Sequence, residues 1–447
     1  MNAMGGASAT GTHSAAAAGL HDRTLRRAAL ASSLGNFIEW FDYASYSYFA
    51  TVIAVVFFPT TNPQLALVET FGVFALSFLL RPIGAIVWGN WGDRRGRKWA
   101  LSVSILLMAG STFAIGCLPG YAQIGVAAPL LLLLIRMVQG FSASGEYAGA
   151  AIFLAEYCPV RKRGIYVSLI PASTAVGLLA GSVTATVLHA VLEPSQIHAW
   201  GWRLPFLAAA PLGLITRYIR THLEDSPVYS EMVEKSAASR GESSRPVRTV
   251  ITQHGRALAI SIGVASLNAV AFYLVLTYLP TYLVAELHLD SEPAFLASTL
   301  TLVVYVLGIF GMGWMSDHVG RKRMLVGACI GFILLSVPAF LLFDTRSFIW
   351  IVVAELVLCM LLTANDGTLA TFLSESFPTN VRYTGFALSM NLANAIFGGT
   401  AALASTWLIG ATGLEIAPAL YLIAIAIGAL VAMLLAHEHS HRDLSDI

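Results

Sequence analysis

Charged residues are scarce in this sequence. Only 11% of its 447 residues are Asp, Glu, Lys or Arg, and 57% are hydrophobic, whereas soluble globular proteins carry roughly 25% charged residues. The mean hydropathy is +0.72. So little charge cannot cover the surface of a soluble protein of this length. We therefore predict a chain that crosses a lipid bilayer several times.

Cysteine, histidine and net charge are also limited. The four cysteines are far apart and lie in or beside apolar stretches, which argues against a disulfide framework or a zinc site. The net charge is only +1, so we expect no nucleic acid partner. None of the eleven histidines lies deep within an apolar stretch, and His437, His439 and His441 fall in a tail that we expect to be solvated. We expect neither a metal site nor a cofactor.

Twelve apolar stretches are long enough to cross a bilayer, which takes roughly 20 residues. Together they predict an all-α membrane protein with twelve transmembrane helices. They lie near 28–57, 67–91, 99–118, 127–157, 165–192, 202–219, 257–285, 294–315, 324–343, 348–376, 384–409 and 416–436.

The polar segments divide the chain into domains. Residues 220–255 are polar and predict a linker between a six-helix bundle at 28–219 and a second bundle at 256–436. Residues 1–27 lack the apolar core of a cleavable signal peptide and predict a disordered N-terminal tail. Residues 437–447 are predicted to form a C-terminal tail.

Positive charge is concentrated on alternate connections. Twenty-two of the 26 Lys and Arg residues fall in the tails, in the linker or within three residues of it, or in the connections after the second, fourth, eighth and tenth stretches. Cytoplasmic loops of membrane proteins carry such an excess. We therefore predict that both termini are cytoplasmic.

Two motifs occur twice. W-G-N-W-G-D-R-R-G-R-K at 88–98 matches M-G-W-M-S-D-H-V-G-R-K at 312–322, and F-L-A-E-Y-C-P at 153–159 matches F-L-S-E-S-F-P at 372–378. The offsets are 224 and 219 residues, close to half of the chain, which indicates a duplicated six-helix unit. Many secondary transporters are built from such repeats, with the binding site at the repeat interface near the middle of the membrane.

The repeated motifs predict a cytoplasmic gate. A glycine four residues before an aspartate lets helices approach closely, and the aspartate can accept hydrogen bonds from an arginine or a helix N-terminus. A glutamate on an adjacent helix can hold the cations of the following G-R-K turn. The alternative is that the loop is basic only because cytoplasmic loops carry an excess of Lys and Arg. The repeated aspartate argues against this alternative. The predicted gate residues are Asp93, Arg97, Glu156, Asp317, Arg321 and Glu375.

The duplicated loops resemble the signature of the major facilitator superfamily. G-N-F-I-E-W-F-D-Y at 35–43, R-M-V-Q-G-F-S-A-S-G-E-Y at 136–147 and W-G-W-R-L-P-F at 200–206 resemble its metabolite:proton symporter branch. G-E-Y-A-G-A at 145–150 and L-T-Y-L-P-T-Y-L at 276–283 look closest to proline/betaine transporters. The resemblance implies two six-helix bundles, a proton gradient as the energy source and a bacterial inner membrane. The branch also contains carriers for 2-oxoglutarate, citrate and shikimate.

The first helix is predicted to carry two acids near the middle of the membrane. If it starts at Ala28, Glu39 lies about 16 Å along it, near the centre of a ~30 Å hydrocarbon core. Asp42, Tyr43 and Tyr46 share the face of Glu39 at 100° per residue. Two acids one turn apart repel when both are ionised, which favours a shared proton and makes the pair a candidate for proton coupling. The alternative is that each acid forms a buried ion pair that holds helices together.

Further charges lie inside the predicted helices, and each demands a partner, a cavity or a function. Arg136 is predicted either to bind a substrate carboxylate or to pair with an acid on the first or second helix. Arg81 is predicted either to contact the substrate or to extend toward the cytoplasm. Glu146 and Asp366 occupy nearly equivalent places in the two repeats and are further candidates for coupling or substrate binding, and Glu355 is also embedded.

These features favour a proton-coupled symporter for a small molecule that works by alternating access as a monomer. Embedded acids outnumber embedded arginines, which favours a zwitterion, its carboxylate on an arginine and its cation near an acid or an aromatic face. The candidate faces are Tyr43, Tyr46, Phe272 and Tyr273, and the alternative is that these aromatics pack the core. An organic acid carrier is the alternative. A membrane enzyme would need a cluster of nucleophile, histidine or metal ligands, and none is found. The duplicated gate argues against a channel or a sensor.

Overall fold

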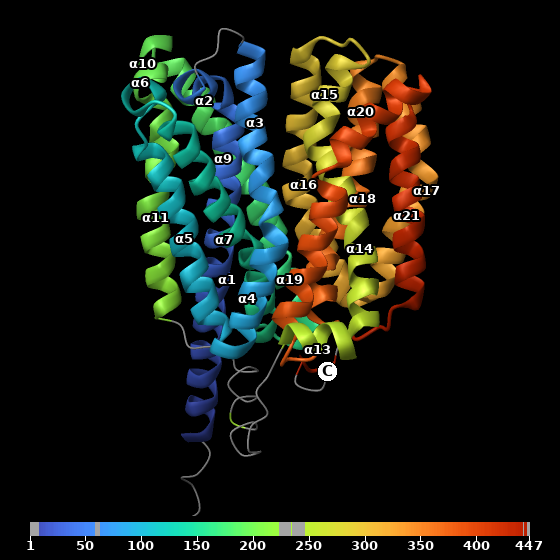
Figure 1. Ribbon diagram of the computed structural model, residues 1–447. Helices are drawn as coiled ribbons and strands as arrows, with labels where there is room; N and C mark the ends of the chain where they lie inside the picture. Colours follow the sequence, from blue (N-terminus) through green and yellow to red (C-terminus); the bar gives the residue numbers. More distant parts are fainter. Residues whose placement is uncertain (1–8, 59–62, 223–233, 235–245, 441, 445–447) are drawn as a thin grey trace, which may run out of the picture.

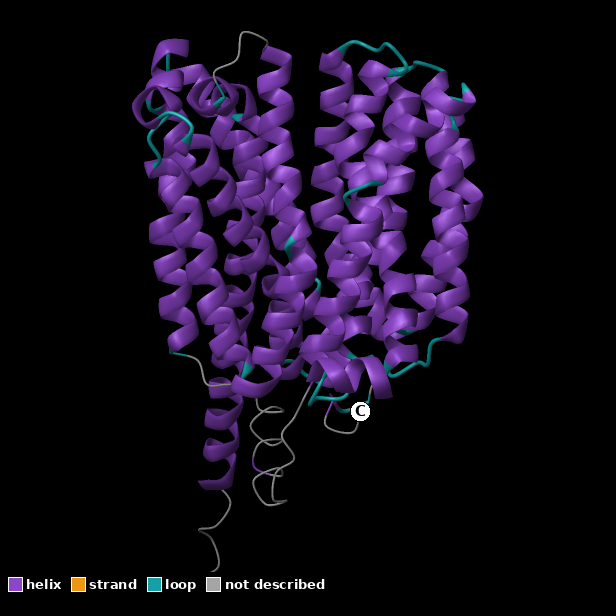
Figure 2. Ribbon diagram, in the orientation of Figure 1, coloured by secondary structure: helices purple, strands orange, loops and turns teal. Residues whose placement is uncertain are grey.

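The computed structural model describes residues 9–58, 63–222, 234, 246–440 and 442–444. Within these ranges the protein consists of helices and loops without a strand (Figures 1 and 2). The first half contains α1 (Ala9–Tyr48), α2 (Ala50–Phe57), α3 (Pro63–Leu79), α4 (Arg81–Arg95), α5 (Arg97–Cys117), α6 (Tyr121–Ile124), α7 (Ala127–Tyr157), η1 (Val160–Lys162), α8 (Arg163–Val167), α9 (Leu169–Val191), α10 (Pro194–Ala199), η2 (Gly201–Arg203) and α11 (Leu204–Thr221). The second half contains α13 (Pro246–Gln253), α14 (Gly255–Tyr273), η3 (Leu274–Tyr278), α15 (Leu279–Ala285), α16 (Ser291–Val319), α17 (Arg321–Asp344), α18 (Phe348–Ser374), α19 (Arg382–Ala393), η4 (Asn394–Gly398), α20 (Ala401–Thr412) and α21 (Ala417–Leu435).

Short helices that continue one another combine into twelve transmembrane helices, six in each half, which confirms the predicted fold. The twelve are α1–α2, α3–α4, α5, α7, α8–α9, α11, α14–α15, α16, α17, α18, α19–α20 and α21. Nine helical segments of the described chain are long and apolar enough to cross a membrane by length and composition alone. The first, second and sixth are interrupted or more polar, and they complete the bundle beside the others (Figure 1).

Two segments differ from the sequence-based prediction. Helix α1 begins at Ala9, so the structure describes residues 9–27 as helical where the sequence predicts a disordered tail. The run of alanines there favours a helix because alanine has the highest helix propensity. Helix α13 lies inside the predicted linker. Residues 1–8 of the tail and residues 223–233 and 235–245 of the linker lie outside the described residues.

The two halves share one packing plan. In the first half α1 packs on α9, and α5 packs on α7 and α11. In the second half α14 packs on α19, and α17 packs on α18 and α21. The glycine that follows each repeated aspartate motif has the same backbone conformation, with φ 100° at Gly96 and φ 98° at Gly320. Glycine adopts such a φ without steric cost, so both copies of the motif make the same turn.

The halves meet along helices that carry the repeated motifs. Helix α4 contacts α19 across the interface, and α16 contacts α8 and α9 in the corresponding way. The turns after α4 and α16 and the C-terminal tail lie at one end of the molecule, at the bottom of Figure 1. We call this the basic end, because both turns carry the G-R-K sequence.

Helices α1 and α9 approach closely through a G-x-x-x-G pair, Gly177 and Gly181, on α9. A Cβ on Gly177 would lie 2.8 Å from the carbonyl oxygen of Phe37 and 3.0 Å from the amide nitrogen of Phe41. Small residues at such spacing let helix backbones come together in membranes. This contact fixes the position of the helix that bears Glu39 and Asp42.

Substitution of Gly177 by Leu should therefore destabilise the first half. We expect a loss of about 1–3 kcal/mol, the usual cost of overpacking, measured as a lower midpoint of thermal unfolding of the purified protein. The control is Gly110→Leu on α5, where a Cβ meets no other atom within 4 Å. Equal midpoints for the two variants would contradict this account of the α1–α9 contact.

Candidate transport site and gate

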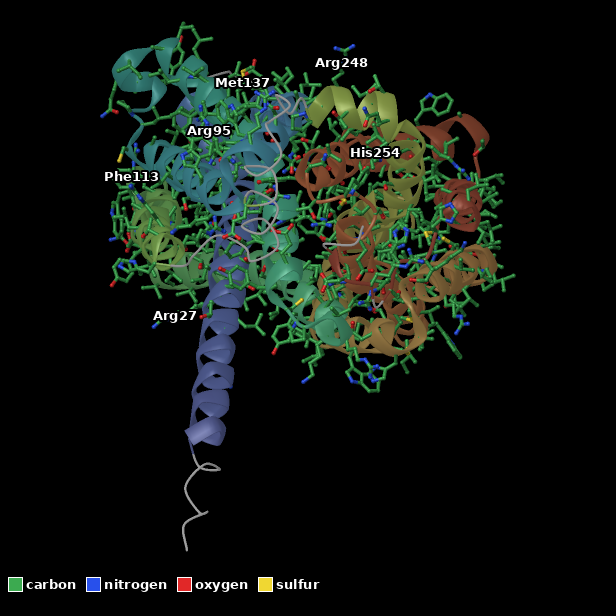
Figure 3. All side chains as sticks on the ribbon, turned by 90° about the horizontal axis from the view of Figure 1, so that it is seen from below. Arg27, Arg95, Phe113, Met137, Arg248 and His254 are labelled. Carbon is green, nitrogen blue, oxygen red and sulfur yellow. The ribbon has the colours of Figure 1, made fainter. Side chains whose placement is uncertain are left out.

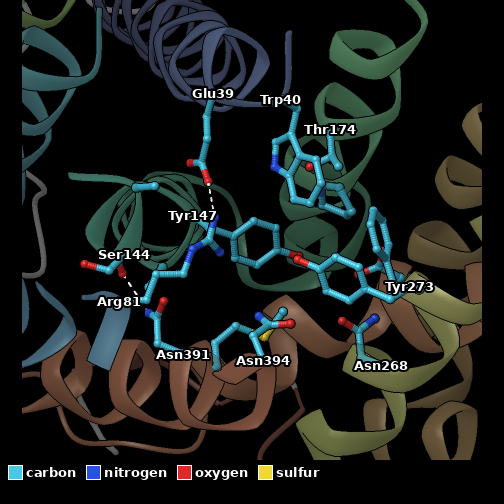
Figure 4. A pocket seen from close by; sticks show the side chains of 16 residues that line it. Glu39, Trp40, Arg81, Ser144, Tyr147, Thr174, Asn268, Tyr273, Asn391 and Asn394 are labelled. Carbon is cyan, nitrogen blue, oxygen red and sulfur yellow. Dashed lines mark hydrogen bonds and ion pairs between the residues drawn. The ribbon is translucent and has the colours of Figure 1, made fainter. Parts of the chain in front are cut away.

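A cavity lies between the two halves, and roughly 600 Å³ of space there, open solvent included, is not filled by protein atoms (Figure 4). Among its residues are polar groups from both halves and several aromatic rings. The lining residues are Glu39, Trp40, Arg81, Ala143, Ser144, Tyr147, Ala148, Pro171, Thr174, Asn268, Phe272, Tyr273, Asp366, Met390, Asn391 and Asn394.

One side of the cavity is formed by an arginine and a glutamate. The Nη2 atom of Arg81 lies 3.3 Å from Oε1 of Glu39 and donates a hydrogen bond to the Tyr43 hydroxyl at 2.6 Å. The guanidinium also stacks 4.4 Å from the centre of the Phe78 ring. Arg81 is only 5% exposed, so the alternative that it extends toward the cytoplasm is wrong. Its partners on the first helix hold it in the cavity wall.

The second acid of the first helix has an arginine of its own. Asp42 Oδ2 accepts from Arg136 Nη1 at 2.6 Å, and Oδ1 accepts from Gln139 at 3.1 Å. The Arg136 guanidinium lies 3.8 Å from the centre of the Tyr46 ring, and Tyr46 donates to the Thr70 carbonyl. Arg136 is fully buried outside the cavity lining. Of the alternatives drawn from the sequence, the geometry matches an Arg136 that pairs with an acid on the first helix.

Glu146 and Asp366 differ in surroundings despite their equivalent places in the repeats. Glu146 forms an ion pair with Arg220 and accepts from Ser104 Oγ at 2.7 Å, within the first half. Asp366 lines the cavity and accepts a hydrogen bond from Tyr305. No basic side chain of the described chain forms an ion pair with it. Sequence reasoning missed Arg220 because this residue falls in the predicted linker, whereas α11 continues to Thr221.

Aromatic rings form the wall opposite Arg81. The ring centres of Trp40 and Phe272 are 5.3 Å apart across the two halves, and those of Phe272 and Tyr273 are 5.6 Å apart. Figure 4 shows the Tyr147 ring between Arg81 and Tyr273. Tyr273 and Asn394 border the π-helical turns η3 and η4, a local distortion that is frequent at functional sites. No pattern in the sequence predicts these turns.

A carboxylate from the first half caps a helix of the second half. Asp93 on α4 accepts from the backbone amides of Tyr383 and Thr384 at 3.1 and 2.9 Å, in the first turn of α19. It also accepts from Arg97 at 2.9 Å. Val381, the described residue before α19, makes no side-chain cap. Asp93 therefore satisfies amides that a helix leaves without an internal partner.

The second copy makes the reciprocal contact. Asp317 on α16 accepts from the backbone amides of Gly164 and Ile165 at 2.7 and 3.0 Å, in the first turn of α8. It also accepts from Arg321 at 2.8 Å. A Cβ on Gly164 would overlap the Gly313 backbone, so glycine is needed for this approach.

Two glutamates complete the contact between the halves. Glu156 accepts from Arg382 at 2.9 Å and lies 3.6 Å from Arg97. Glu375 accepts from Arg163 at 2.7 Å and lies 3.5 Å from Arg321. The nearer arginine comes from the opposite half in both cases. Sequence reasoning missed that role of Arg163 and Arg382, although the repeat alignment places one on the other. We call the cluster the latch: Asp93, Arg97, Glu156, Arg163, Asp317, Arg321, Glu375 and Arg382.

The C-terminal tail packs against the latch. The carbonyl oxygen of Leu444 accepts from Arg382 at 2.8 Å, and that of Arg442 accepts from Arg163 at 3.4 Å. His439 Nδ1 lies 2.9 Å from the Glu375 carbonyl oxygen, and Leu444 is 1% exposed. The predicted solvated tail is thus only partly solvated: His437 and Arg442 are exposed, whereas Leu444 is buried and backbone carbonyls of the tail accept from the latch arginines. His441 lies outside the described residues.

The fold and these contacts define a class: a multi-pass membrane transporter made of two repeated halves, with a cavity between them and a latch at one end. Within the described residues there is no group of three or more His, Cys, Asp or Glu that could hold a metal ion. The family model of the major facilitator superfamily matches residues 33–402. The chain belongs to this superfamily.

Relatives are similar over nearly the whole chain. The chain is 36% identical over 434 residues to the glycine betaine/proline/ectoine/pipecolic acid transporter OusA of Dickeya dadantii (strain 3937), covering 95% of this chain and 86% of that protein. It is 35% identical, with the same coverage, to the proline/betaine transporter of Salmonella typhimurium. The proton:xylose symporter XylE bound to 6-bromo-6-deoxy-D-glucose has the same fold, with a TM-score of 0.78 at 16% identity over 95% of this chain and 98% of that chain.

Replacement of the capping aspartates should weaken the latch. In Asp93→Asn or Asp317→Asn the neutral side chain loses the charge that attracts a helix N-terminus, so the equilibrium shifts away from the latched state. We expect normal membrane insertion and uptake lowered about tenfold or more. Because both aspartates accept two amides from the opposite half, we expect similar losses in the two variants.

The measurement is uptake into cells at matched expression of each variant. The control is Asp344→Asn, an exposed acid in the last turn of α17, at the end away from Gly320. Wild-type uptake in both latch variants would refute a role of these contacts in the transport cycle.

Proposed function

We propose that this protein is a proton-coupled symporter that imports a small zwitterionic osmolyte of the proline or betaine kind. The observation that carries the proposal is the polarity of the cavity, with Arg81 and Glu39 on one side and aromatic rings with Asp366 on the other. The names of relatives at 34–36% identity, all proline/betaine-type transporters, support this substrate class.

A zwitterion fits these charges better than an organic acid. Its carboxylate would accept hydrogen bonds from Arg81, as carboxylates do from a guanidinium. Its cationic nitrogen would lie against Trp40, Phe272 and Tyr273, with Asp366 as the counter-charge. A cation–π contact contributes ~0.5–2 kcal/mol. A second or third carboxylate would face Glu39 or Asp366 and be repelled.

Proton coupling follows from competition for Arg81. When Glu39 is ionised, its carboxylate lies against the Arg81 guanidinium, 3.3 Å away. When Glu39 binds a proton, that attraction falls, and the guanidinium can bind the substrate carboxylate instead. A proton and a substrate therefore enter the cavity together. Asp42, paired with Arg136 outside the cavity, supports the helix rather than carrying the proton.

Alternating access then opens the cavity first to one face of the membrane and then to the other. The basic end faces the cytoplasm, since 22 of the 26 Lys and Arg residues belong to connections or tails assigned to that side. The latch closes that face, and its opening releases substrate and proton inward. The protein acts as a monomer in a bacterial inner membrane, with both termini in the cytoplasm. The proton gradient supplies the energy, and transport needs no cofactor.

The coupling proposal predicts a specific defect in Glu39→Gln. The amide binds no proton and carries no charge with which to compete with the substrate carboxylate for Arg81. Accumulation driven by a pH gradient should therefore be abolished. Counterflow, which needs no net proton movement, should persist. Both are measured in proteoliposomes, with Glu69→Gln on the exposed surface of α3 as the control. Continued accumulation against a gradient in Glu39→Gln would show that the proton binds at another residue, and Asp366 would be the next candidate.

Competition assays test the substrate class. Uptake of radiolabelled proline by proteoliposomes with an acidic outside should be inhibited by glycine betaine, and citrate and 2-oxoglutarate should leave it unchanged. Replacement of Phe272 by Leu should raise KM for betaine about twofold to tenfold, because one cation–π face is lost. Inhibition by the organic acids, with none by betaine, would favour an organic acid carrier over the proposed function.

A further inference from the structure

A second hollow lies on the outer surface near the basic end, between α4 and α13. It contains roughly 1020 Å³ of space open to the outside. Helix α4 belongs to the first half and α13 to the second, so the hollow, which we call the lateral groove, spans the two halves. Its lining residues are Ile86, Val87, Asn90, Trp91, Arg94, Val247, Arg248, Ile251 and Thr252.

The α4 wall continues a surface that faces the hydrocarbon. Leu79, Ile83 and Ile86 are 68%, 53% and 42% exposed, and they lie three or four residues apart on one helical face. Exposed apolar side chains on a transmembrane helix contact acyl chains. The same face ends in Arg94, one turn before α5 begins. The wall therefore changes from apolar to cationic toward the basic end.

The α13 wall has the same two-part character. Pro246 and Val250 are buried and anchor the helix against the bundle. Ile251 is 58% exposed and lines the groove. The Arg248 side chain points outward from the edge of the molecule in the view along the bundle (Figure 3). A helix with an apolar and a basic face is suited to the membrane surface.

We propose that the lateral groove binds a phospholipid with an anionic headgroup. One acyl chain lies against Ile86, Val87 and Ile251, and the headgroup phosphate lies between the guanidinium groups of Arg94 and Arg248. Arginine binds phosphate through paired hydrogen bonds, and Asn90 and Thr252 add polar contacts. A soluble anion would leave the apolar walls unused. The lipid joins α4 to α13 and thus the two halves beside the latch. This inference does not depend on the identity of the transported substrate.

The test is native mass spectrometry of the purified full chain in detergent with equal amounts of dioleoyl phosphatidylglycerol and dioleoyl phosphatidylcholine. We expect the wild type to retain phosphatidylglycerol preferentially. Arg94→Gln and Arg248→Gln should each weaken its binding about fivefold, the usual contribution of one basic residue at an anionic surface. Ile251→Glu should also weaken it, through repulsion and loss of the apolar wall. The matched control, Arg161→Gln in η1, removes an exposed arginine away from the groove and should change nothing.

Glycerol 3-phosphate in excess distinguishes a lipid from a free phosphate, and it should leave the bound lipid in place. Displacement of the lipid by that anion would overturn the lipid assignment. Equal retention of the two lipids, or unchanged binding in Arg248→Gln and Ile251→Glu, would also overturn the proposal. An equal loss in Arg161→Gln would assign the binding to diffuse surface charge instead. Size-exclusion chromatography establishes that each variant is folded before lipid is added.

Discussion

The arrangement of the two halves depends on helix N-termini that are capped from the opposite half. Asp93 caps α19, and Asp317 caps α8. The first amides of a helix need acceptors, and burial makes an unsatisfied amide expensive, costing about 1–3 kcal/mol. Separation of the halves at the basic end removes both acceptors at once, so water must enter as the contact breaks. The amides are thus hydrogen-bonded to aspartates in the closed state and to water in the open state. A contact that breaks and re-forms in every transport cycle requires both.

Buried ion pairs in the first half serve two different purposes. Asp42 with Arg136 and Glu146 with Arg220 lie outside the cavity lining and join transmembrane helices of one half. Removal of one partner from such a pair is expensive because it leaves a charge uncompensated, typically 3–5 kcal/mol. The pair of Glu39 and Arg81 borders the cavity, where a ligand can replace either partner. An ion pair between arginine and a carboxylate therefore supports the structure where it is enclosed, and it can exchange partners where it borders a cavity.

The sequence predicts the fold well because hydropathy and repetition are properties of the chain alone. Twelve apolar stretches and two repeated motifs were enough for the bundles, and Asp93 and Asp317 could be linked to helix N-termini from the motif itself. The partners of embedded charges were harder. Arg220 pairs with Glu146 only because α11 runs on past the predicted membrane boundary, and the choice between Asp42 and substrate for Arg136 depends on the rotation of α7 relative to α1. Phe272 and Tyr273 could be proposed from their place near the middle of the seventh helix, whereas no local pattern marks Trp40 and Tyr147, which come from other helices.

The C-terminal tail touches two arginines of the latch through backbone atoms, which every residue possesses. Arg163 and Arg382 donate to the backbone carbonyls of Arg442 and Leu444, not to their side chains. Most substitutions in the tail therefore leave these bonds intact, while insertion or deletion of a residue shifts both carbonyls out of register. Side chains restrict the choice of amino acid elsewhere in the described tail: Leu444 is buried, the Ser440 hydroxyl accepts from the Arg321 amide, and the Glu438 carboxylate accepts from the Lys322 amide. The number of residues between α21 and Leu444 therefore sets the position of both carbonyls, so the length of this segment is constrained as well as its side chains.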